Sequence, residues 1–471
     1  MYRTVHRVTA PEAALPDGKR VPLGWSARAV VPGGELTILH WHDKDFLMTD
    51  HTRLRICTAI DVREDLLVEV VTLGTERVLG TLDIRYAPVF QMLELPLSLN
   101  DALEALKEGV GLRMTKGQSA LWFLVQSSDT AIREPALLPH LLAQSAQTKL
   151  QSFHERMNSL ASIQQFGWME GCVLDGLLDL GYHSAVRSHL DQYITSDGEL
   201  IYEDPRSCPV DGVFYGIEST LPIAILAKLE PESPLVDRAA QFMLAHTDAR
   251  GVIQDGDTLS AEGSYTIAYP LAVIAKQRGD RKLAQLAYHQ LVHRRDHLWD
   301  GDALCLRTRN DGVRTFRNWG RAYAWHLLGL VRCLEVWSDQ GLVDSEQLRL
   351  IEQEFARTMN AANSYRNRQG LWSCFLDAPE TGVDTSASAA IAAAAVIAGR
   401  VGLPDYTVGM DLEEVTQALL QYLTPDGFMT GTAQSNKNGE ELQRSGYRVI
   451  SQMAMGLMAQ LLAAQDEEST N

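Results

Sequence analysis

Carboxylates, an arginine and aromatic side chains stand where apolar helical stretches begin in the C-terminal two-thirds of this chain. These residues are Glu170, Asp211, Glu262, Trp319, Arg321, Asp384 and Tyr447. Carboxylates can do acid–base work at a glycosidic bond, and aromatic rings pack against the apolar faces of sugars. If these side chains meet in one place, their mixture of types is typical of a carbohydrate site.

Each carboxylate also has a purely structural interpretation when it is taken alone. Asp211 and Asp384 are good N-cap residues, while Glu170 and Glu262 suit the first turn of a helix, where the helix dipole favours negative charge. Capping does not explain why an arginine and several aromatics occupy equivalent positions. We therefore expect the helix starts to converge on one polar mouth.

Arg321 is the candidate that sets the charge of a ligand. Arg321 and Trp325 are four residues apart and so share a helix face. A guanidinium binds a carboxylate through two parallel hydrogen bonds, and a buried arginine without an anionic partner is costly. Two partners stay open at this point: an internal salt bridge to Asp211 or Glu262, or a uronate carboxylate on a substrate.

The elements that must position these residues are helices with a repeating organisation from about residue 140 onward. Six times, a polar or glycine-rich loop leads into a helix rich in Ala, Gly and Leu, as in residues 386–398. Such a helix is apolar nearly all round and must be buried. Amphipathic helices lie between these segments, at residues 143–160, 184–194, 235–246, 281–297, 345–363 and 411–422. This pattern predicts an (α/α)6 barrel over residues 140–465 and makes an open α-solenoid the alternative.

Residues 1–135 have a different character and predict a β-rich N-terminal domain. Short β-prone runs bounded by turn residues occur at residues 35–40, 54–60, 66–73, 78–85 and 120–125. Several short strands at regular spacing favour a sandwich-like arrangement. Residues 97–107 predict one helix among them, and residues 127–139 predict a linker to the barrel.

Composition excludes several classes of partner. The 471 residues are 45% hydrophobic and 22% charged, and the net charge of −18 argues against nucleic acid, which needs a basic face. We expect no membrane span or secretory signal, and we expect the six cysteines to be reduced in a cytoplasmic protein. Ligand spacings for a metal are missing, as is a phosphate-binding loop, so we expect no metal and no cofactor. Self-association into a homo-oligomer is compatible with this composition.

Two motifs resemble segments of the unsaturated rhamnogalacturonyl and unsaturated glucuronyl hydrolases, glycoside hydrolase families 105 and 88. Residues 316–325 are similar to the family's Trp-(Gly/Ala)-Arg-Gly-Asn-Gly-Trp segment, and residues 384–389 are similar to its Glu-Thr-Ser-Gly-Ser-Ala block. Three further blocks follow the family order. They are residues 210–216, residues 262–265 with Pro270, and residues 370–372. The resemblance covers roughly residues 140–465.

The resemblance implies a six-hairpin barrel that acts on a terminal uronate with a C4=C5 double bond. A carboxylic acid protonates the alkene, water adds at C5, and the resulting hemiketal opens to release the next sugar. Asp211 and Glu262 become the candidate acid–base pair. Substrate contacts are implied for Glu170, Tyr265, Trp319, Arg321, Trp325, Trp372, Asp384 and Tyr447. Two positions depart from the family: Glu262 stands where it carries Asp, and Arg307 where it carries His.

Three functions agree with these observations. The first is an exo-acting hydrolase that removes a terminal glucuronate or galacturonate, unsaturated or saturated, from an oligosaccharide. The second is direct inverting or retaining hydrolysis of a saturated β-glucuronide, which needs two carboxylates at a suitable separation. The third is a non-catalytic carbohydrate-binding protein. The distances among Asp211, Glu262 and Arg321 would separate them best.

Overall fold

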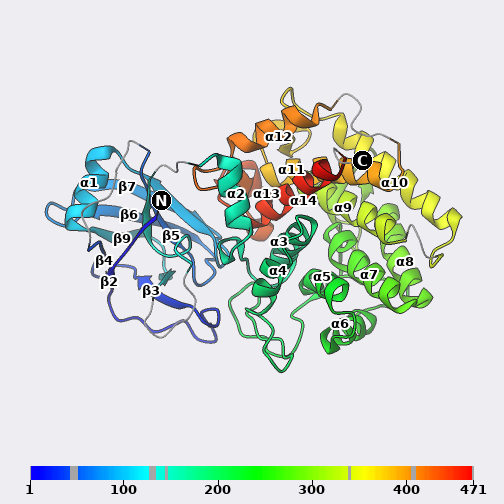
Figure 1. The fold of residues 1–471 in the computed structure, drawn as a ribbon, viewed down its shortest axis with the longest axis horizontal. Helices are drawn as coiled ribbons and strands as arrows, with labels where there is room; N and C mark the ends of the chain where they lie inside the picture. The colour runs from blue at the N-terminus through cyan, green and yellow to red at the C-terminus, as the bar shows by residue number, and fades with distance from the viewer. Residues whose placement is uncertain are drawn as a thin grey trace.

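The computed structural model describes residues 2–42, 51–126, 134–143, 147–337, 341–404 and 410–468. Figure 1 shows a β-rich region at one end of the molecule and a helical body that makes up the rest. Most of the predicted linker, residues 127–133, lies outside the described residues. The change from strands to helices along the chain agrees with the change in sequence pattern near residue 140.

Six described helices form the inner ring of the helical body. They are α3 (Trp168–Asp179), α5 (Leu221–Leu229), α7 (Tyr269–Arg278), α9 (Gly320–Trp337), α11 (Thr385–Arg400) and α14 (Gln452–Glu468). Each packs against the next in this order, and α14 packs back against α3, which closes the ring. The closed ring distinguishes this body from an open solenoid.

An outer helix lies against each inner helix. The outer helices are α2 (Lys149–Met157), α4 (His183–Leu190), α6 (Pro234–Ala245), α8 (Arg281–His297), α10 (Ser345–Asn363) and α12 (Leu412–Gln421). Helix α2 packs on α14, and each of the others packs on the inner helix that precedes it in the chain. Five of the outer helices lie within four residues of their predicted bounds at each end, whereas α2 begins at Lys149, six residues later than predicted.

Small side chains explain how closely the inner helices approach one another. A Cβ added to Gly176 on α3 would lie 2.3 Å from the carbonyl oxygen of Gly456 on α14, so neither position has room for a side chain. Helix α11 is buried from Thr385 to Ala398, and most of its residues there are alanine or serine. This confirms the burial predicted from the Ala-rich sequence.

The N-terminal region contains two larger sheets and one two-stranded sheet. The strands are β1 (Tyr2–Thr4), β2 (Arg7–Thr9), β3 (Ser26–Val30), β4 (Thr37–His40), β5 (Arg53–Cys57), β6 (Asp65–Thr72), β7 (Val78–Arg85), β8 (Met92–Pro96), β9 (Val110–Lys116), β10 (Leu121–Val125) and β11 (His140–Leu142). One sheet has the order β2-β4-β9-β6-β7, another β1-β11-β5-β8, and β3 pairs with β10. Residues from all three share one apolar core, together with α1 (Leu99–Glu108).

Strand β11 moves the end of the β-rich region beyond the expected residue 135. Its residues His140–Leu142 pair antiparallel with both β1 and β5. Residues 140–142 therefore belong to the N-terminal sheets and not to the barrel, because their backbone groups complete a sheet between two strands. The sandwich-like description itself stays a prediction.

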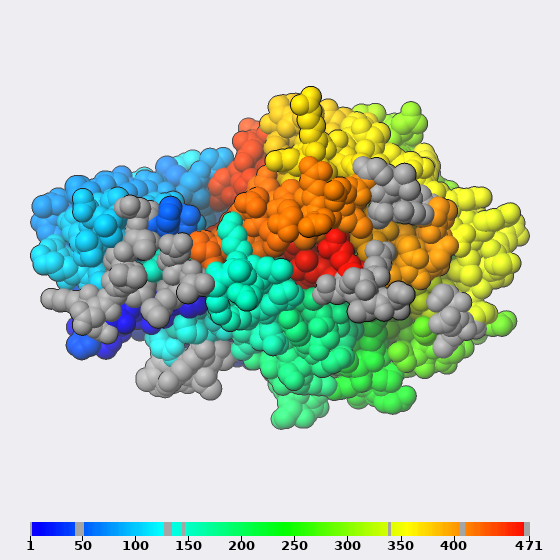
Figure 2. All heavy atoms as spheres, turned by 45° about the horizontal axis from the view of Figure 1, so that its top comes forward, coloured from blue at the N-terminus to red at the C-terminus, as the bar shows by residue number. Residues whose placement is uncertain are grey.

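A buried charge cluster joins the β-rich region to the barrel. Arg55 of β5 is 1% exposed, and its Nη1 lies 2.6 Å from Oδ2 of Asp426, which follows α12. The Tyr2 hydroxyl donates to the same carboxylate at 2.7 Å. The Arg55 guanidinium holds the pKa of Asp426 down, at about 2, against the opposing effect of burial. Figure 2 shows the blue and cyan N-terminal residues in contact with this orange part of the barrel.

Candidate active site

A polar cavity of about 450 Å³ lies where several inner helices begin. Its charged lining residues are Arg63, Asp204, Arg206, Glu218, Asp255, Glu262, Arg307 and Lys437, and its aromatic lining residues are Phe166, Trp168 and Tyr215. A larger groove, of about 570 Å³, lies in the β-rich region, and its lining is mostly alanine. We place the candidate site in the smaller cavity because it combines carboxylates, cations and aromatic rings.

Glu262 lies in this cavity, as the helix-start argument predicted. It stands between β12 (Thr258–Ser260) and the π-helical turn η3 (Ser264–Ala268), which continues directly into α7. The Asn436 amide donates to Glu262 Oε1 at 3.3 Å, and Arg307 Nη2 lies 3.7 Å from Glu262 Oε2. Arg307 occupies β14 (Ala303–Arg309), whose pairing with Ser260 brings the two side chains together.

Glu218 is a second carboxylate in the cavity, and the sequence reasoning missed it. It lies in the 3-10 turn η2 (Ile217–Thr220), immediately before α5. Burial, followed by the negative charge of Glu262, raises the pKa of Glu218 to about 8, although Arg307 opposes this shift. A carboxylic acid that is still protonated near neutral pH can donate a proton in catalysis. The available signal was a Glu directly before the apolar run that begins at Leu221.

Aromatic and cationic side chains complete the cavity wall. Trp168, the first residue of α3, is half-buried and meets Trp325 edge-on at a ring separation of 5.6 Å. Lys437 donates to the Pro205 carbonyl at 3.2 Å. Burial and the nearby Arg63 lower the pKa of Lys437 to about 8. The cavity thus offers a ring surface, proton-transfer groups and positive charge within one small volume.

Asp211 does not stand at the start of an inner helix, and this expectation was wrong. Helix α5 begins at Leu221, ten residues later, and Asp211 is exposed in a turn. Both terminal nitrogens of Arg20, from the N-terminal region, donate to the Asp211 carboxylate at 2.8 Å. Arg20 holds the pKa of Asp211 below its ordinary value. Asp211 therefore links the barrel to the β-rich region in this structure.

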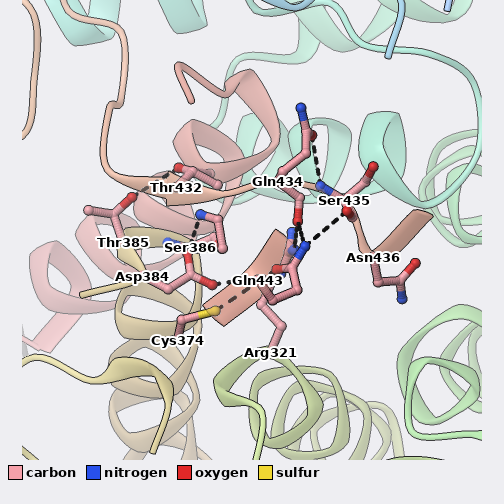
Figure 3. Close-up of polar contacts among 12 residues, drawn as sticks. Arg321, Cys374, Asp384, Thr385, Ser386, Thr432, Gln434, Ser435, Asn436 and Gln443 are labelled. Atoms are coloured by element: carbon pink, nitrogen blue, oxygen red, sulfur yellow. Dashed lines mark hydrogen bonds and ion pairs between the residues drawn. The ribbon is translucent and has the colours of Figure 1, made fainter. Parts of the chain in front are cut away.

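Arg321 is buried inside the ring and has an internal partner. Its Nε lies 3.7 Å from Oδ2 of Asp384, its Nη2 donates to the Gln434 carbonyl, and its guanidinium lies 4.5 Å from the ring centroid of Trp319. Figure 3 shows Arg321 and Asp384 beneath the segment that carries Gln434. The expected internal salt bridge exists, but its partner is Asp384 and not Asp211 or Glu262. With 1% of Arg321 exposed, a substrate carboxylate has no access to it in this structure.

The polar groups of Glu170 and Tyr265 also form hydrogen bonds inside the protein. Glu170 is fully buried, lies 2.7 Å from His189 Nδ1, and accepts from the Gln164 backbone N–H at 2.7 Å. The Tyr265 hydroxyl donates to Asp175 at 2.5 Å. These contacts satisfy polar groups that would otherwise be costly to bury, so both side chains support the wall of the site from behind.

The predicted stacking surfaces are mostly inside the protein. Trp319, Trp325 and Trp372 are 1%, 3% and 0% exposed, and the Trp372 indole donates to the Ala362 carbonyl at 2.8 Å. A sugar ring therefore cannot lie against Trp319 or Trp372 as they stand, and Trp168 takes the position at the cavity. The Tyr447 hydroxyl donates to the Asp83 carbonyl at 2.9 Å and so contacts the β-rich region.

Two further observations concern the described residues as a whole. Within the described ranges, no helix combines the length and apolarity needed to cross a bilayer. In the same ranges, no three His, Cys, Asp or Glu side chains gather as a group that could hold a metal ion.

Comparison with known proteins relates the barrel to glycoside hydrolases. Residues 269–467 match the model of Glycosyl Hydrolase Family 88. The unsaturated rhamnogalacturonyl hydrolase YesR of Bacillus subtilis is 28% identical over 171 residues, which are 36% of this chain and 44% of that enzyme. The chain thus matches less than half the length of that relative. The resemblance to families 88 and 105 is confirmed, and the chain is a relative of glycoside hydrolases.

Solved structures support the same fold. A possible member of glycoside hydrolase family 105 from Klebsiella pneumoniae aligns with a TM-score of 0.57 and 15% identity, over 64% of this chain and 83% of that one. A family 105 glycoside hydrolase from C. acetobutylicum aligns with a TM-score of 0.55 and 17% identity, over 68% of this chain and 100% of that one. At these identities the likeness concerns the six-hairpin fold alone.

Proposed function

We propose that this chain is an exo-acting glycoside hydrolase that removes a terminal uronate from an oligosaccharide by carboxylate acid–base chemistry. One observation carries the proposal: Glu218 shares a cavity with Glu262 and with cations suited to an acidic sugar. Burial and the charge of Glu262 raise the pKa of Glu218 to about 8. The Glu218–Glu262 pair takes the place of the Asp211–Glu262 pair expected from the sequence.

Glu218 is the proton donor in this proposal. In the reaction that the family resemblance implies, its carboxyl proton passes to C4 of the double bond, and the oxygen of a water molecule bonds to C5. Glu262 accepts the proton that this water releases. Its contacts with Arg307 and Asn436 favour a fixed orientation, and proton transfer is efficient only when donor and acceptor are positioned within hydrogen-bond reach.

The sugar carboxylate binds to Arg307 in this proposal, in place of the buried Arg321. Arg307 has 30% of its side chain exposed, and it lines the cavity beside both glutamates. The Arg307 guanidinium can donate paired hydrogen bonds to a carboxylate while it keeps its contact with Glu262. Trp168 supplies the ring surface against which the sugar lies.

Direct hydrolysis of a saturated β-glucuronide is the second candidate. Two carboxylates in one cavity are also what an inverting or retaining glycosidase needs. The two reactions differ in whether the substrate must carry a C4=C5 double bond. They also differ in their products, because direct hydrolysis releases an intact uronate whose anomeric configuration can be read by NMR.

The deciding experiment incubates the purified chain with unsaturated uronyl disaccharides and follows the loss of double-bond absorbance. Glucuronyl and galacturonyl substrates are compared, and aryl β-glucuronides are assayed in parallel. Turnover of either unsaturated substrate supports the proposal, and turnover of the aryl glucuronides alone supports the second candidate. Inactivity on every substrate refutes both. Cytoplasmic location and self-association stay predictions from the sequence.

A further inference from the structure

The β-rich region contributes a side chain to the candidate active site. Arg63 follows β5 and lines the cavity that holds Glu218 and Glu262. Its Nε donates to Asp61 Oδ2 at 2.6 Å, its Nη2 donates to the Pro205 carbonyl, and 39% of its side chain is exposed. The guanidinium is therefore oriented by the protein and still accessible from the cavity.

Around Arg63, the cations Lys19, Arg206 and Lys437 outnumber the carboxylates of Asp61 and Asp204. Glu218 also acts on Lys437, but its pKa of about 8 leaves it mostly protonated at neutral pH. Asp61 is fully buried and already receives Lys19 Nζ at 2.9 Å as well as Arg63. Lys437 is close enough for its pKa to be lowered by Arg63, and Arg206 lines the same wall. Asp204 faces these cations, but its Oδ1 accepts the backbone N–H groups of Arg206 and Cys208. Placing like charges together is unfavourable unless an anion joins them.

From this arrangement we infer that Arg63 and Lys437 form a second anion-binding subsite, which takes an acidic group on the sugar next to the terminal uronate. The inference rests on the proposed function and narrows it to substrates with at least two acidic groups. Lys437 and Arg307 line the same cavity as Glu218, so both subsites border the same proton donor. A cavity of about 450 Å³ has room for a short saccharide that spans them.

Contacts other than those of Arg63 also hold the wall that carries this subsite. The Arg20 backbone N–H donates to the Ser207 carbonyl at 2.9 Å, and the Asp61 backbone N–H donates to Ser207 Oγ at 2.9 Å. Arg20 also bridges to Glu203 and Asp211. Replacing Arg63 should therefore remove the charge without releasing the loop of residues 202–211 from the β-rich region.

The test uses two unsaturated uronyl disaccharides that differ only in whether the second sugar carries an acidic group, a carboxylate or a sulfate. We expect the wild-type chain to have the higher kcat/KM on the acidic substrate. Arg63→Ala should lower that kcat/KM by about tenfold to a hundredfold, mainly through KM, because a charge-assisted hydrogen bond is lost. The neutral substrate should change less than about threefold, and Arg63→Lys should restore part of the preference.

Arg113→Ala is the matched control. Arg113 lies on β9, is exposed to a similar degree, and pairs with Glu69 and Glu76 outside the cavity. Its replacement should change neither substrate. Equal turnover of both disaccharides by the wild-type chain, or an equal loss on both in Arg63→Ala, overturns the inference.

Calorimetry measures how tightly the same two disaccharides bind, whether or not the chain cleaves them. The subsite can therefore be tested separately from the proposed function. If the wild-type chain cleaves neither disaccharide, the proposed function fails. Weaker binding of the acidic disaccharide to Arg63→Ala then still supports the subsite. Identical binding of both disaccharides to the two proteins refutes it.

Discussion

Arg321 and Asp384 stand at the starts of two adjacent inner helices, with the guanidinium nitrogen Nε 3.7 Å from the carboxylate oxygen Oδ2. Asp384 also caps α11, since its Oδ1 accepts from the Ser386 backbone N–H at 3.1 Å. Both residues are buried. Arg321 and Asp384, for which the sequence separately implied substrate contacts, therefore connect α9 to α11 inside the ring.

Replacement of Arg321 should lower stability more than it affects substrate affinity. Arg321→Ala leaves the buried Asp384 carboxylate without its cation, and breaking a buried pair in this way costs about 3–5 kcal/mol of unfolding free energy. Denaturant titration measures the loss. Arg314→Ala is the control. Arg314 is exposed, and its Nη1 lies 3.8 Å from Oδ1 of Asp300. Such surface ion pairs contribute about 1 kcal/mol or less to stability. If Arg321→Ala raised KM at least tenfold and left the free energy of unfolding unchanged, Arg321 would instead be a substrate-binding residue.

Glu218 and Asp211 should respond very differently to the loss of their charge. Glu218→Gln removes the proposed proton donor with little change in shape, and we expect kcat to fall by about 10²- to 10⁴-fold. Asp211→Asn weakens only the exposed contact with Arg20 and should retain activity within about threefold. Initial rates on an unsaturated uronyl disaccharide compare the two variants. Loss of activity in Asp211→Asn alone would favour the acid–base assignment made from the family resemblance.

The activity should decline as pH rises through about 8, where Glu218 loses its proton. Below that pH the carboxyl is protonated and can act as an acid, and above it the donor is absent. Since the charge of Glu262 helps to raise the pKa of Glu218, Glu262→Gln should move the Glu218 titration to lower pH. Residual activity, or carboxyl chemical shifts of labelled glutamate, reports this titration. An unchanged titration midpoint in Glu262→Gln would contradict the proposed coupling of the two carboxyls.

The Arg55–Asp426 pair should control stability at acid pH. The pKa of Asp426 is about 2 in the folded chain, below the ordinary value of 3.8. The stabilisation is therefore complete above pH 3.8 and is lost as pH falls towards 2. Asp426→Asn should cost about 3–5 kcal/mol at neutral pH, because Arg55 stays buried with less compensation. Thermal melts from pH 2 to 7 test this. If the stability of Asp426→Asn falls with pH in the same way as that of the wild-type chain, Asp426 is not the cause of the acid sensitivity.

The helical part of the fold could be read closely from the sequence. The Ala-rich stretch at residues 386–398 and the amphipathic helices between the inner segments correspond to α11 and the six outer helices. Glu262 was also located in the right place, because it directly precedes the turn that leads into α7. Asp211 and Glu218 were not distinguished, since both precede the same apolar run and only one of them lies next to the helix.

The sequence by itself determined the ring of helices, because the helical period of apolar residues and the runs of small side chains are patterns contained in short stretches of sequence. It also determined the relationship to glycoside hydrolases, through motifs a few residues long. Tertiary structure alone decided which charges face the cavity. Arg20 and Asp211 are 191 residues apart, and Arg55 and Asp426 are 371 residues apart. Both pairings depend on how the β-rich region packs on the barrel. Burial beside Glu262 then makes Glu218 an acid, which residue type and spacing could not reveal.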